Sequence, residues 1–304
     1  MRIPWWLFAF LGVAVIWGSS FALIEVALTA FSPSQITVGR LLLGALTLAV
    51  LLLAMGKFPN LRQLDLKSIA FIAATTAAGF ILTAVAQMHI TSSSAGLLNA
   101  SVPLWTALFV ALLVPRERPS GKQLSGLIVG FAGMFVLVEA WEIFTGNAIN
   151  FVGTLALLGA TCCYGLGSAV ARWRLADSKA SNMQLCMVQL SIAAVLTTLS
   201  LPIGATTVQS SPTFGAIASV VLLGVLSGAV AFVLFWYLMS KTGAVTSASV
   251  YYAMPVVACI VGVVFLNETL QLAQVIGAVV VVAGIVLSMR QLPQAQEEQT
   301  GSVS

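Results

Sequence analysis

The sequence predicts an all-α integral membrane protein of ten transmembrane helices, arranged as two inverted five-helix repeats with both termini in the cytoplasm. Three observations predict this fold. Hydrophobic residues make up 60% of the 304 residues and charged residues only 7%, whereas an ordinary soluble domain has about 25% charged residues. The apolar residues fall into runs of about 20, the length that a helix needs to cross a bilayer. Basic residues fall in alternate loops between these runs, and the second half of the chain repeats motifs of the first.

Ten apolar runs account for almost the whole chain and leave no room for a soluble domain. We expect helices at 5–27, 33–55, 67–88, 94–114, 122–140, 151–172, 181–202, 214–238, 246–266 and 272–289. The first run follows one basic residue, Arg2, as in a secretory signal, but it is too long for one and lacks a clear cleavage site. We therefore expect it to be retained as the first helix.

The orientation follows from the basic residues, because cytoplasmic loops retain Lys and Arg. Twelve of the 13 basic residues fall before the first span, in alternate loops or after the last span, which predicts cytoplasmic N- and C-termini. The exception is Arg40, which lies within the second predicted span.

An internal repeat relates residues 1–140 to residues 151–290, with 291–304 left as a cytoplasmic tail. The repeated positions are Glu117 and Glu268, Gln123 and Gln274, Gly126 and Gly277, Gly133 and Gly284, and Pro103 and Pro255. Because five crossings are an odd number, the second half must enter the membrane from the opposite face. Inverted repeats of this kind are a construction that secondary transporters use.

The order of these motifs resembles the drug/metabolite transporter superfamily, and within it the EamA-type members. The motifs are W-G-S-S-F from Trp17, P-S-Q-I-T-V-G-R ending at Arg40, and a P…E…Q-x-x-G pattern that closes each half. The resemblance covers residues from about 5 to 290. It implies ATP-independent transport of small metabolites, commonly export of amino acids, across a bacterial inner membrane. The second half has Gln189 roughly where the first has Arg40, so any role of this arginine is asymmetric.

Arg40 is the first candidate for a functional group inside the membrane. It lies seven residues past Pro33, about 10 Å along a helix, and a buried ion costs at least a few kcal/mol unless it is paired. Its predicted neighbours are Glu25 and His89, which lie near the non-cytoplasmic ends of the first and third predicted helices. Arg40 either pairs with Glu25 to hold helices together, or serves as a gate or as an anchor for a substrate carboxylate. His89 is either structural or couples transport to protons.

Aromatic and neutral polar residues at midplane depth predict a cavity for a neutral or zwitterionic organic solute, with helix packing as the alternative for each residue alone. The predicted binding residues are Trp17, Asn99, Trp105, Tyr164, Tyr251 and Tyr252. Pro103 and Pro255 lie beside them as predicted helix breakers. A proline within a span frees backbone carbonyls, which only protein or a wet cavity can satisfy.

Other classes of protein lack support in the sequence. No nucleotide-binding loop, nucleophile elbow or paired C-x-x-C is present, and a single histidine excludes a histidine-rich metal site. We expect no catalytic residue, metal, cofactor or nucleic-acid partner.

The G-x-x-x-G pairs, Gly126 with Gly130 and Gly224 with Gly228, favour packing within a monomer over dimerisation. The alternatives that remain are an importer or facilitator of another metabolite or drug-like compound, a passive channel and an integral-membrane enzyme.

Overall fold

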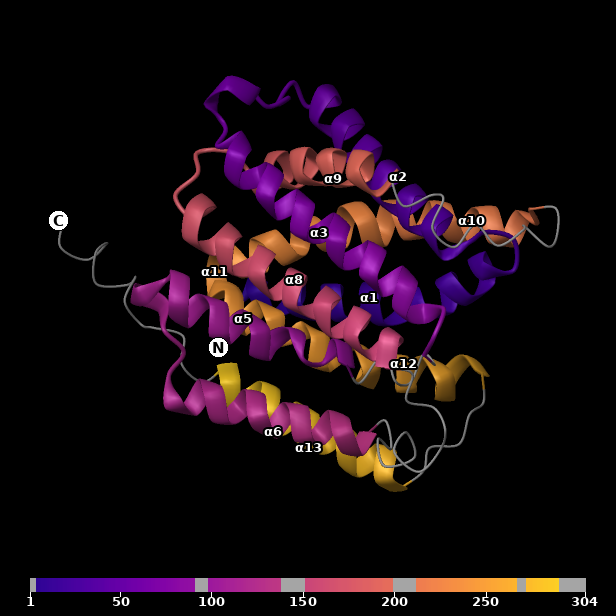
Figure 1. The fold of residues 1–304 in the computed structure, drawn as a ribbon, viewed down its shortest axis with the longest axis vertical. Helices are drawn as coiled ribbons and strands as arrows, with labels where there is room; N and C mark the ends of the chain where they lie inside the picture. Colours follow the sequence, from indigo (N-terminus) through magenta and orange to yellow (C-terminus); the bar gives the residue numbers. More distant parts are fainter. Residues whose placement is uncertain (1–3, 91–97, 138–150, 199–211, 267–271, 290–304) are drawn as a thin grey trace.

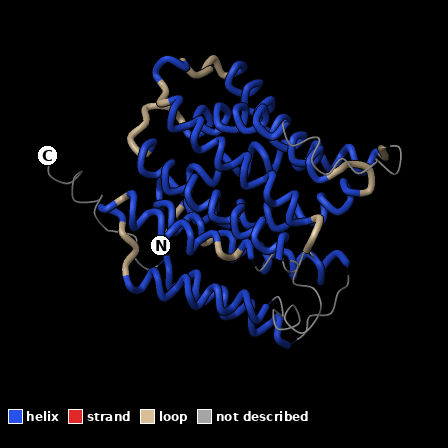
Figure 2. Tube along the Cα trace, viewed as in Figure 1, coloured by secondary structure: helices blue, strands red, loops and turns tan. Residues whose placement is uncertain are grey.

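The computed structural model describes residues 4–90, 98–137, 151–198, 212–266 and 272–289, and within these ranges it contains helices and no strand (Figures 1 and 2). A helix lies in each of the ten predicted ranges. The helices are α1 (Trp5–Leu28), α2 (Pro33–Ala54), α3 (Leu66–Gln87), α5 (Val102–Leu113), α6 (Gly121–Leu137), α8 (Phe151–Leu175), α9 (Asn182–Thr198), α10 (Phe214–Leu222), η3 (Leu223–Val230), α11 (Ala231–Ala248), α12 (Val250–Leu266) and α13 (Leu272–Met289). Two short 3₁₀ turns, η1 (Leu61–Gln63) and η2 (Pro115–Glu117), lie in connections.

Length and composition make this an all-α integral membrane protein. Six helical segments in the described ranges are long and apolar enough to cross a membrane, including the continuous segment Phe214–Ala248. Three further apolar helices, Val102–Leu113, Gly121–Leu137 and Asn182–Thr198, are shorter. In a bilayer every backbone polar group must be satisfied internally, so long apolar segments of this kind form helices.

Capping residues explain where two of the helices begin. The side chains of Ser32 and Gln35 form a reciprocal capping box at the start of α2, with Pro33 in the first turn. The side chain of Asp65 accepts a hydrogen bond from the backbone nitrogen of Ser68 at the start of α3. These local signals fix the two helix starts close to the predicted positions.

The two halves of the chain interleave rather than sitting side by side. Helix α1 packs on α12 and α11, while α8 packs on α5 and α3. Helix α2 packs on α9 and η3, and α9 packs on α3. When α10, η3 and α11 together are taken as the counterpart of α3, exchanging α1 with α8, α2 with α9, α5 with α12 and α6 with α13 leaves this pattern of contacts unchanged. The helices therefore pack with an approximate two-fold relation between the halves.

Helices α6 and α13 form an antiparallel pair along one edge of the bundle (Figure 1). A Cβ atom at Gly133 would lie 2.6 Å from the backbone nitrogen of Val281, and one at Gly126 would lie 2.5 Å from that of Ser288. The glycines therefore permit backbone contact. Because α6 and α13 close the two repeats, their antiparallel packing is the arrangement that an inverted repeat requires.

The second G-x-x-x-G pair also packs within the chain. Gly228 lies against the backbone carbonyl of Arg40 and the Cα of Gly44, so that α2 and η3 approach closely. Residues 223–230 form a π-helix, a form that recurs at functional sites. Nothing in the sequence predicts this irregular turn.

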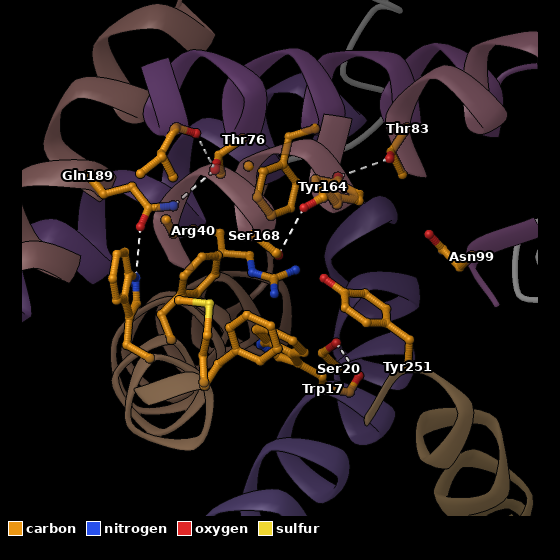
Figure 3. A pocket seen from close by; sticks show the side chains of 18 of the residues that line it. Trp17, Ser20, Arg40, Thr76, Thr83, Asn99, Tyr164, Ser168, Gln189 and Tyr251 are labelled. Carbon is orange, nitrogen blue, oxygen red and sulfur yellow. Dashed lines mark hydrogen bonds between the residues drawn. The ribbon is translucent and has the colours of Figure 1, made fainter. Parts of the chain in front are cut away.

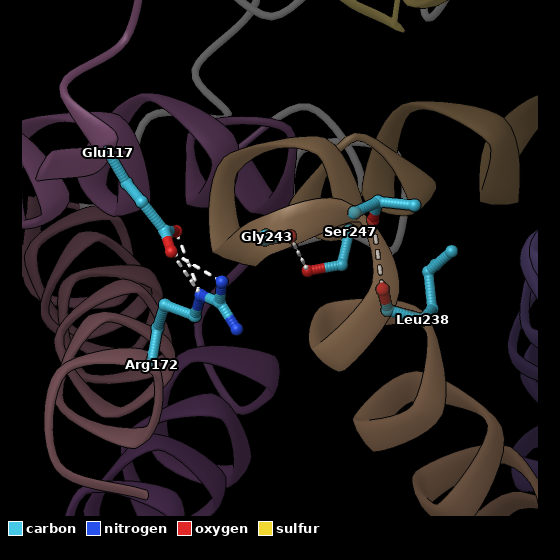
Figure 4. A network of polar contacts seen from close by, with 6 residues as sticks. Glu117, Arg172, Leu238, Gly243 and Ser247 are labelled. Carbon is cyan, nitrogen blue, oxygen red and sulfur yellow. Dashed lines mark hydrogen bonds and ion pairs between the residues drawn. The ribbon is translucent and has the colours of Figure 1, made fainter. Parts of the chain in front are cut away.

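The chain turns at Gly243, between the predicted helices 214–238 and 246–266. Residue 243 has a φ of 81°, in the left-handed region that favours glycine. The hydroxyl of Thr242 donates to the Leu238 carbonyl oxygen, and that of Ser247 to the Gly243 carbonyl oxygen, each at 2.9 Å (Figure 4). These bonds support the backbone on both sides of the turn.

The turn at Gly243 and the connections 55–65, 114–120 and 176–181 lie at one end of the bundle, which we call the basic end (Figure 1). Two ion pairs join the halves there. The Nε atom of Arg172 lies 2.7 and 2.8 Å from the two carboxylate oxygens of Glu117 (Figure 4), and Arg174 lies 3.3 Å from Asp65. Hydrogen bonds to Ser68 are the largest influence that lowers the pKa of Asp65, and Arg174 lowers it further.

Candidate functional site

A cavity of about 150 Å³ lies in the centre of the bundle, between α1, α2, α3, α8, α9, α11 and α12 (Figure 3). An apolar protein cavity of about this size accommodates benzene, so the space suits a small organic solute. The residues that line it are Trp17, Ser20, Ile24, Arg40, Ile72, Thr76, Phe80, Thr83, Asn99, Tyr164, Gly167, Ser168, Ala171, Gln189, Phe232, Phe235, Trp236, Met239, Tyr251 and Met254.

Arg40 places a positive charge inside this cavity. Its guanidinium carbon lies 5.2 Å from the centre of the Phe80 ring, and the group points toward the phenols of Tyr164 and Tyr251 (Figure 3). The Nε atom is buried without a hydrogen-bond partner. Among the described side chains, no carboxylate pairs with Arg40 and none lines the cavity. A buried arginine without an anion can accept one from a ligand.

Aromatic rings from α1, α11 and α12 form part of the cavity wall. The ring of Trp17 lies 5.6 Å from Phe232, 5.4 Å from Phe235 and 5.7 Å from Tyr251, measured between centroids. The indole nitrogen of Trp17 donates to the Ser227 carbonyl oxygen of the π-helix at 3.1 Å. This bond fixes the ring, because a buried indole N–H needs an acceptor. The wall therefore offers a rigid apolar surface.

Most hydroxyl groups of the cavity already have partners. Ser20, Thr83 and Ser168 each donate to a carbonyl oxygen of their own helix, and Tyr164 shares a hydrogen bond with Thr83 at 3.1 Å. Within the described structure, the Tyr251 hydroxyl and the Asn99 amide have no hydrogen-bond partner. Together with the Arg40 guanidinium they supply the free polar groups of the cavity.

A hydrogen-bonded chain of cavity-lining side chains joins α3, α9 and α11. The amide nitrogen of Gln189 donates to the Thr76 hydroxyl at 3.0 Å, and its oxygen accepts from the Trp236 indole nitrogen at 2.9 Å (Figure 3). Gln189 therefore uses its amide to hold two helices together. It differs in this from Arg40, its counterpart in the first half.

The two halves contribute matching positions to the cavity. Arg40 corresponds to Gln189, Trp17 to Tyr164, and Asn99 to Tyr251, and all six residues line the cavity. The cavity therefore lies on the approximate two-fold axis that relates the halves. Its positive charge departs from this symmetry.

Two of the predicted cavity residues lie elsewhere. The ring of Tyr252 is fully buried against Gly130, and its hydroxyl donates to the Leu127 carbonyl oxygen at 2.9 Å. Successive residues of an α-helix point about 100° apart, so Tyr251 and Tyr252 face different neighbours. Trp105 stacks on Phe109 of the same helix at 6.3 Å, with its Cβ against Gly165 of α8, and does not line the cavity.

The predicted helix breakers behave differently from each other. Pro103 lies in the first turn of α5, where proline is well tolerated, so it marks a helix start. Pro255 lies inside α12 and has no N–H to donate to the carbonyl four residues earlier, that of Tyr251. Neither proline lines the cavity.

The predicted gating residues are only partly placed. His89 is exposed just after α3, beside Gly153 at the start of α8, and lies away from the cavity. The side chain of Glu25 lies outside the described part of the structure. Of the two predicted gating side chains that the structure describes, Arg40 lines the cavity and His89 does not. Among the described residues, no three His, Cys, Asp or Glu side chains come together as a metal site would require.

Sequence reasoning missed the contributions of α3 and α11. Ile72, Thr76, Phe80 and Thr83 follow one face of α3, and Phe232, Phe235, Trp236 and Met239 follow one face of α11. These positions recur at helical spacing. Because apolar residues surround these helices on all sides, the spacing does not distinguish the cavity face from the other faces.

The sequence profile of the EamA-like transporter family matches this chain twice, at residues 4–139 and 151–290. The chain belongs to the EamA-like transporter family. Similar proteins include the "Probable terminal-alkyne amino-acid exporter" of Streptantibioticus cattleyicolor, 26% identical over 99% of both chains. The "Uncharacterized inner membrane transporter YedA" of Escherichia coli K12 is 24% identical over 92% of this chain and 89% of its own. The "Uncharacterized transporter YvbV" of Bacillus subtilis is 27% identical over 92% and 90%, respectively.

The fold of this EamA-like transporter also matches a solved crystal structure. The TM-score is 0.77 at 21% sequence identity, over 92% of this chain and 95% of the other. The structural likeness supports the helix arrangement, and the family match makes the protein a transporter rather than an enzyme.

Proposed function

We propose that this EamA-like transporter exports a small organic solute with a carboxylate group, most simply an amino acid, by alternating access through the central cavity. In this proposal ten helices cross a bacterial inner membrane, the halves are inverted, and the basic end with both termini faces the cytoplasm.

The charge of Arg40 is the observation that carries the proposal. The guanidinium lies in the cavity without a protein anion among the described residues. A carboxylate can accept two parallel hydrogen bonds from it, and such charge-assisted bonds are about twice as strong as neutral ones. A solute that brings this anion completes the site, whereas a cationic solute would be repelled.

The aromatic wall supports a solute with an apolar part. Trp17, Phe232 and Phe235 present ring faces and edges within one cavity, which suits an apolar or aromatic side chain. The Tyr251 hydroxyl and the Asn99 amide oxygen can accept hydrogen bonds from an ammonium group. The name of the Streptantibioticus relative, an amino-acid exporter, agrees with this solute class.

Alternating access is supported by the relation between the halves. They interleave around the cavity, and α6 and α13 pack antiparallel. Two halves of opposite orientation can exchange conformations and expose one site to either side. We also propose that one chain suffices, because both G-x-x-x-G pairs pack on helices of the same chain.

Counterflow in liposomes tests the proposal. Purified protein would be reconstituted without ATP into liposomes loaded with unlabelled neutral amino acid, and uptake of the labelled amino acid would be followed. We expect saturable, transient accumulation that matching protein-free liposomes lack. Absence of counterflow across a panel of amino acids would refute the proposed substrate class, and flux without saturation would indicate a channel instead.

A further inference from the structure

A second, smaller cavity of about 50 Å³ lies between α8, α9 and α11 at the basic end. Its outer rim includes Ser178 and Ala180 from the connection between α8 and α9, together with the exposed residue Ala176. Its inner wall is formed by Trp236, Met239 and Ala171, which also line the central cavity. The second cavity therefore extends from the basic end to a wall that it shares with the central cavity.

Trp236 is the largest side chain of this shared wall. It is 5% exposed, and Met239 is 4% exposed, so the wall is closed in this structure. Because both cavities touch the same three side chains, one layer of side chains separates them. A rotation of the Trp236 ring would remove most of that layer.

Gln189 holds Trp236 in the closed position. Its amide oxygen accepts from the indole nitrogen at 2.9 Å, and its amide nitrogen is anchored on Thr76 at 3.0 Å. Rotation of the ring would leave a buried donor and a buried acceptor without partners, which disfavours the open position. A solute that supplies hydrogen bonds, or a movement of α3 relative to α11, would lower that barrier.

Basic residues line the second cavity or directly follow its lining residues in the sequence. Arg172 lines it, and Lys179 and Lys241 directly follow the lining residues Ser178 and Ser240. Arg172 is paired with Glu117, which leaves the two lysines in excess over Asp177 nearby. A basic rim raises the local concentration of anions.

We infer that the second cavity is the access route from the basic end to the central cavity, with Trp236 as its gate and Gln189 as the positioning residue that keeps the gate closed. The inference rests on the proposed function, since the solute that takes this route is the carboxylate-bearing solute. It adds a path and two roles that the central cavity alone does not define.

Thiol labelling tests the gate without any transport measurement. The reporter is Ser168→Cys, because Ser168 lines the central cavity and not the second one. It would be introduced into the full chain with Cys162, Cys163, Cys186 and Cys259 replaced by alanine. A membrane-impermeant anionic methanethiosulfonate reagent would then be added to vesicles on the side of the basic end. A separate Lys57→Cys protein identifies that side.

Gln189→Leu and Trp236→Phe each remove the hydrogen bond to the gate. We expect each to raise the rate of Ser168→Cys modification from the basic end by about fivefold or more, the effect of losing one hydrogen bond on a closed–open equilibrium. Because the two variants remove the same bond, the double variant should exceed the larger single effect only slightly. Trp236→Ala, which also removes the ring, should give the fastest modification.

Trp105→Ala is the matched control, because it removes an indole that lines neither cavity, and it should leave the rate unchanged. Lys57→Cys labelling and a monodisperse elution profile confirm that each variant is folded and inserted. Equal modification rates in the parent, Gln189→Leu and Trp236→Phe would overturn the inference, as would an equal increase in Trp105→Ala. Faster labelling in a protein that transports no amino acid would uphold the gate and refute the proposed function alone.

Discussion

Replacement of Arg40 by glutamine separates the two interpretations of this residue. If Arg40 binds the solute carboxylate, Arg40→Gln removes the one positively charged side chain among the described residues that line the cavity. Hydrogen bonds to charged groups contribute about 1.5–3 kcal/mol each, and about 1.4 kcal/mol is a factor of ten in affinity. Glutamine keeps one amide donor for the carboxylate, so one of these bonds is lost, and the half-saturation concentration for an amino acid should rise about 10- to 100-fold.

The assay compares an amino acid with the amine that lacks its carboxylate. Binding to purified protein would be measured by calorimetry for the parent, Arg40→Gln and Arg40→Lys. The amine has no carboxylate and so makes no such bond to Arg40. Arg40→Gln also removes the repulsion between Arg40 and the ammonium group, so the affinity for the amine should stay the same or rise. Arg40→Lys keeps the charge but not the planar fork, and its loss of amino-acid affinity should be intermediate.

Thermal stability supplies the second readout. Arg40 has an unpaired Nε and its cation–π contact with Phe80, a contact that contributes about 0.5–2 kcal/mol. Because no described carboxylate pairs with the guanidinium, its burial is unfavourable, and Arg40→Gln should be about as stable as the parent. Breaking a buried ion pair instead costs about 3–5 kcal/mol. A loss of that size with unchanged amino-acid affinity would refute the substrate-anchor reasoning.

Four further predictions concern particular contacts. Tyr252→Phe should lower the free energy of unfolding by about 0.5–1.5 kcal/mol in a denaturant titration, because it removes a buried hydrogen bond. Tyr251→Phe, whose hydroxyl has no partner among the described residues, should leave stability unchanged and weaken amino-acid binding; the reverse order would contradict both placements. Gly133→Ala brings a Cβ within 2.6 Å of the α13 backbone and should cost about 1–3 kcal/mol in the same titration, and an unchanged midpoint would show that α6 and α13 do not pack this closely. Hydrogen bonds from Ser68 lower the pKa of Asp65, so the stabilisation by this carboxylate is complete above the unfolded carboxyl pKa of about 3.9 and is lost as the pH falls through the lower folded pKa. The stability difference between the parent and Asp65→Ala should therefore be about 0.5–2 kcal/mol at pH 7 and should shrink below pH 4. A difference that stays constant with pH would contradict the capping role of Asp65.

The helix ranges were largely predictable because a membrane imposes them. The range predicted at 33–55 is observed as Pro33–Ala54, and that at 272–289 as Leu272–Met289. Only helices satisfy their own backbone in lipid, so apolar length fixes both the type and the approximate bounds of each element. The π-helix at 223–230, whose Gly228 packs on the backbone of α2, was not predicted from the sequence.

The cavity residues were predictable only where chemistry singled them out. Arg40 stands out as an ion in an apolar run, and Trp17 and Tyr164 as aromatics at midplane depth. Tyr251 and Tyr252 are adjacent and identical in type, so only the helix rotation in the fold decides which one faces the cavity. Gln189 was noted as the counterpart of an arginine, but its bond to Trp236 depends on the packing of α9 against α11.

A structure of the protein with a bound amino acid would test the central claim most directly. We predict density in the central cavity, with the solute carboxylate about 2.7–2.9 Å from the Arg40 guanidinium nitrogens and the side chain against Trp17 and Phe235. Density outside this cavity, or an ammonium group rather than a carboxylate beside Arg40, would contradict the account.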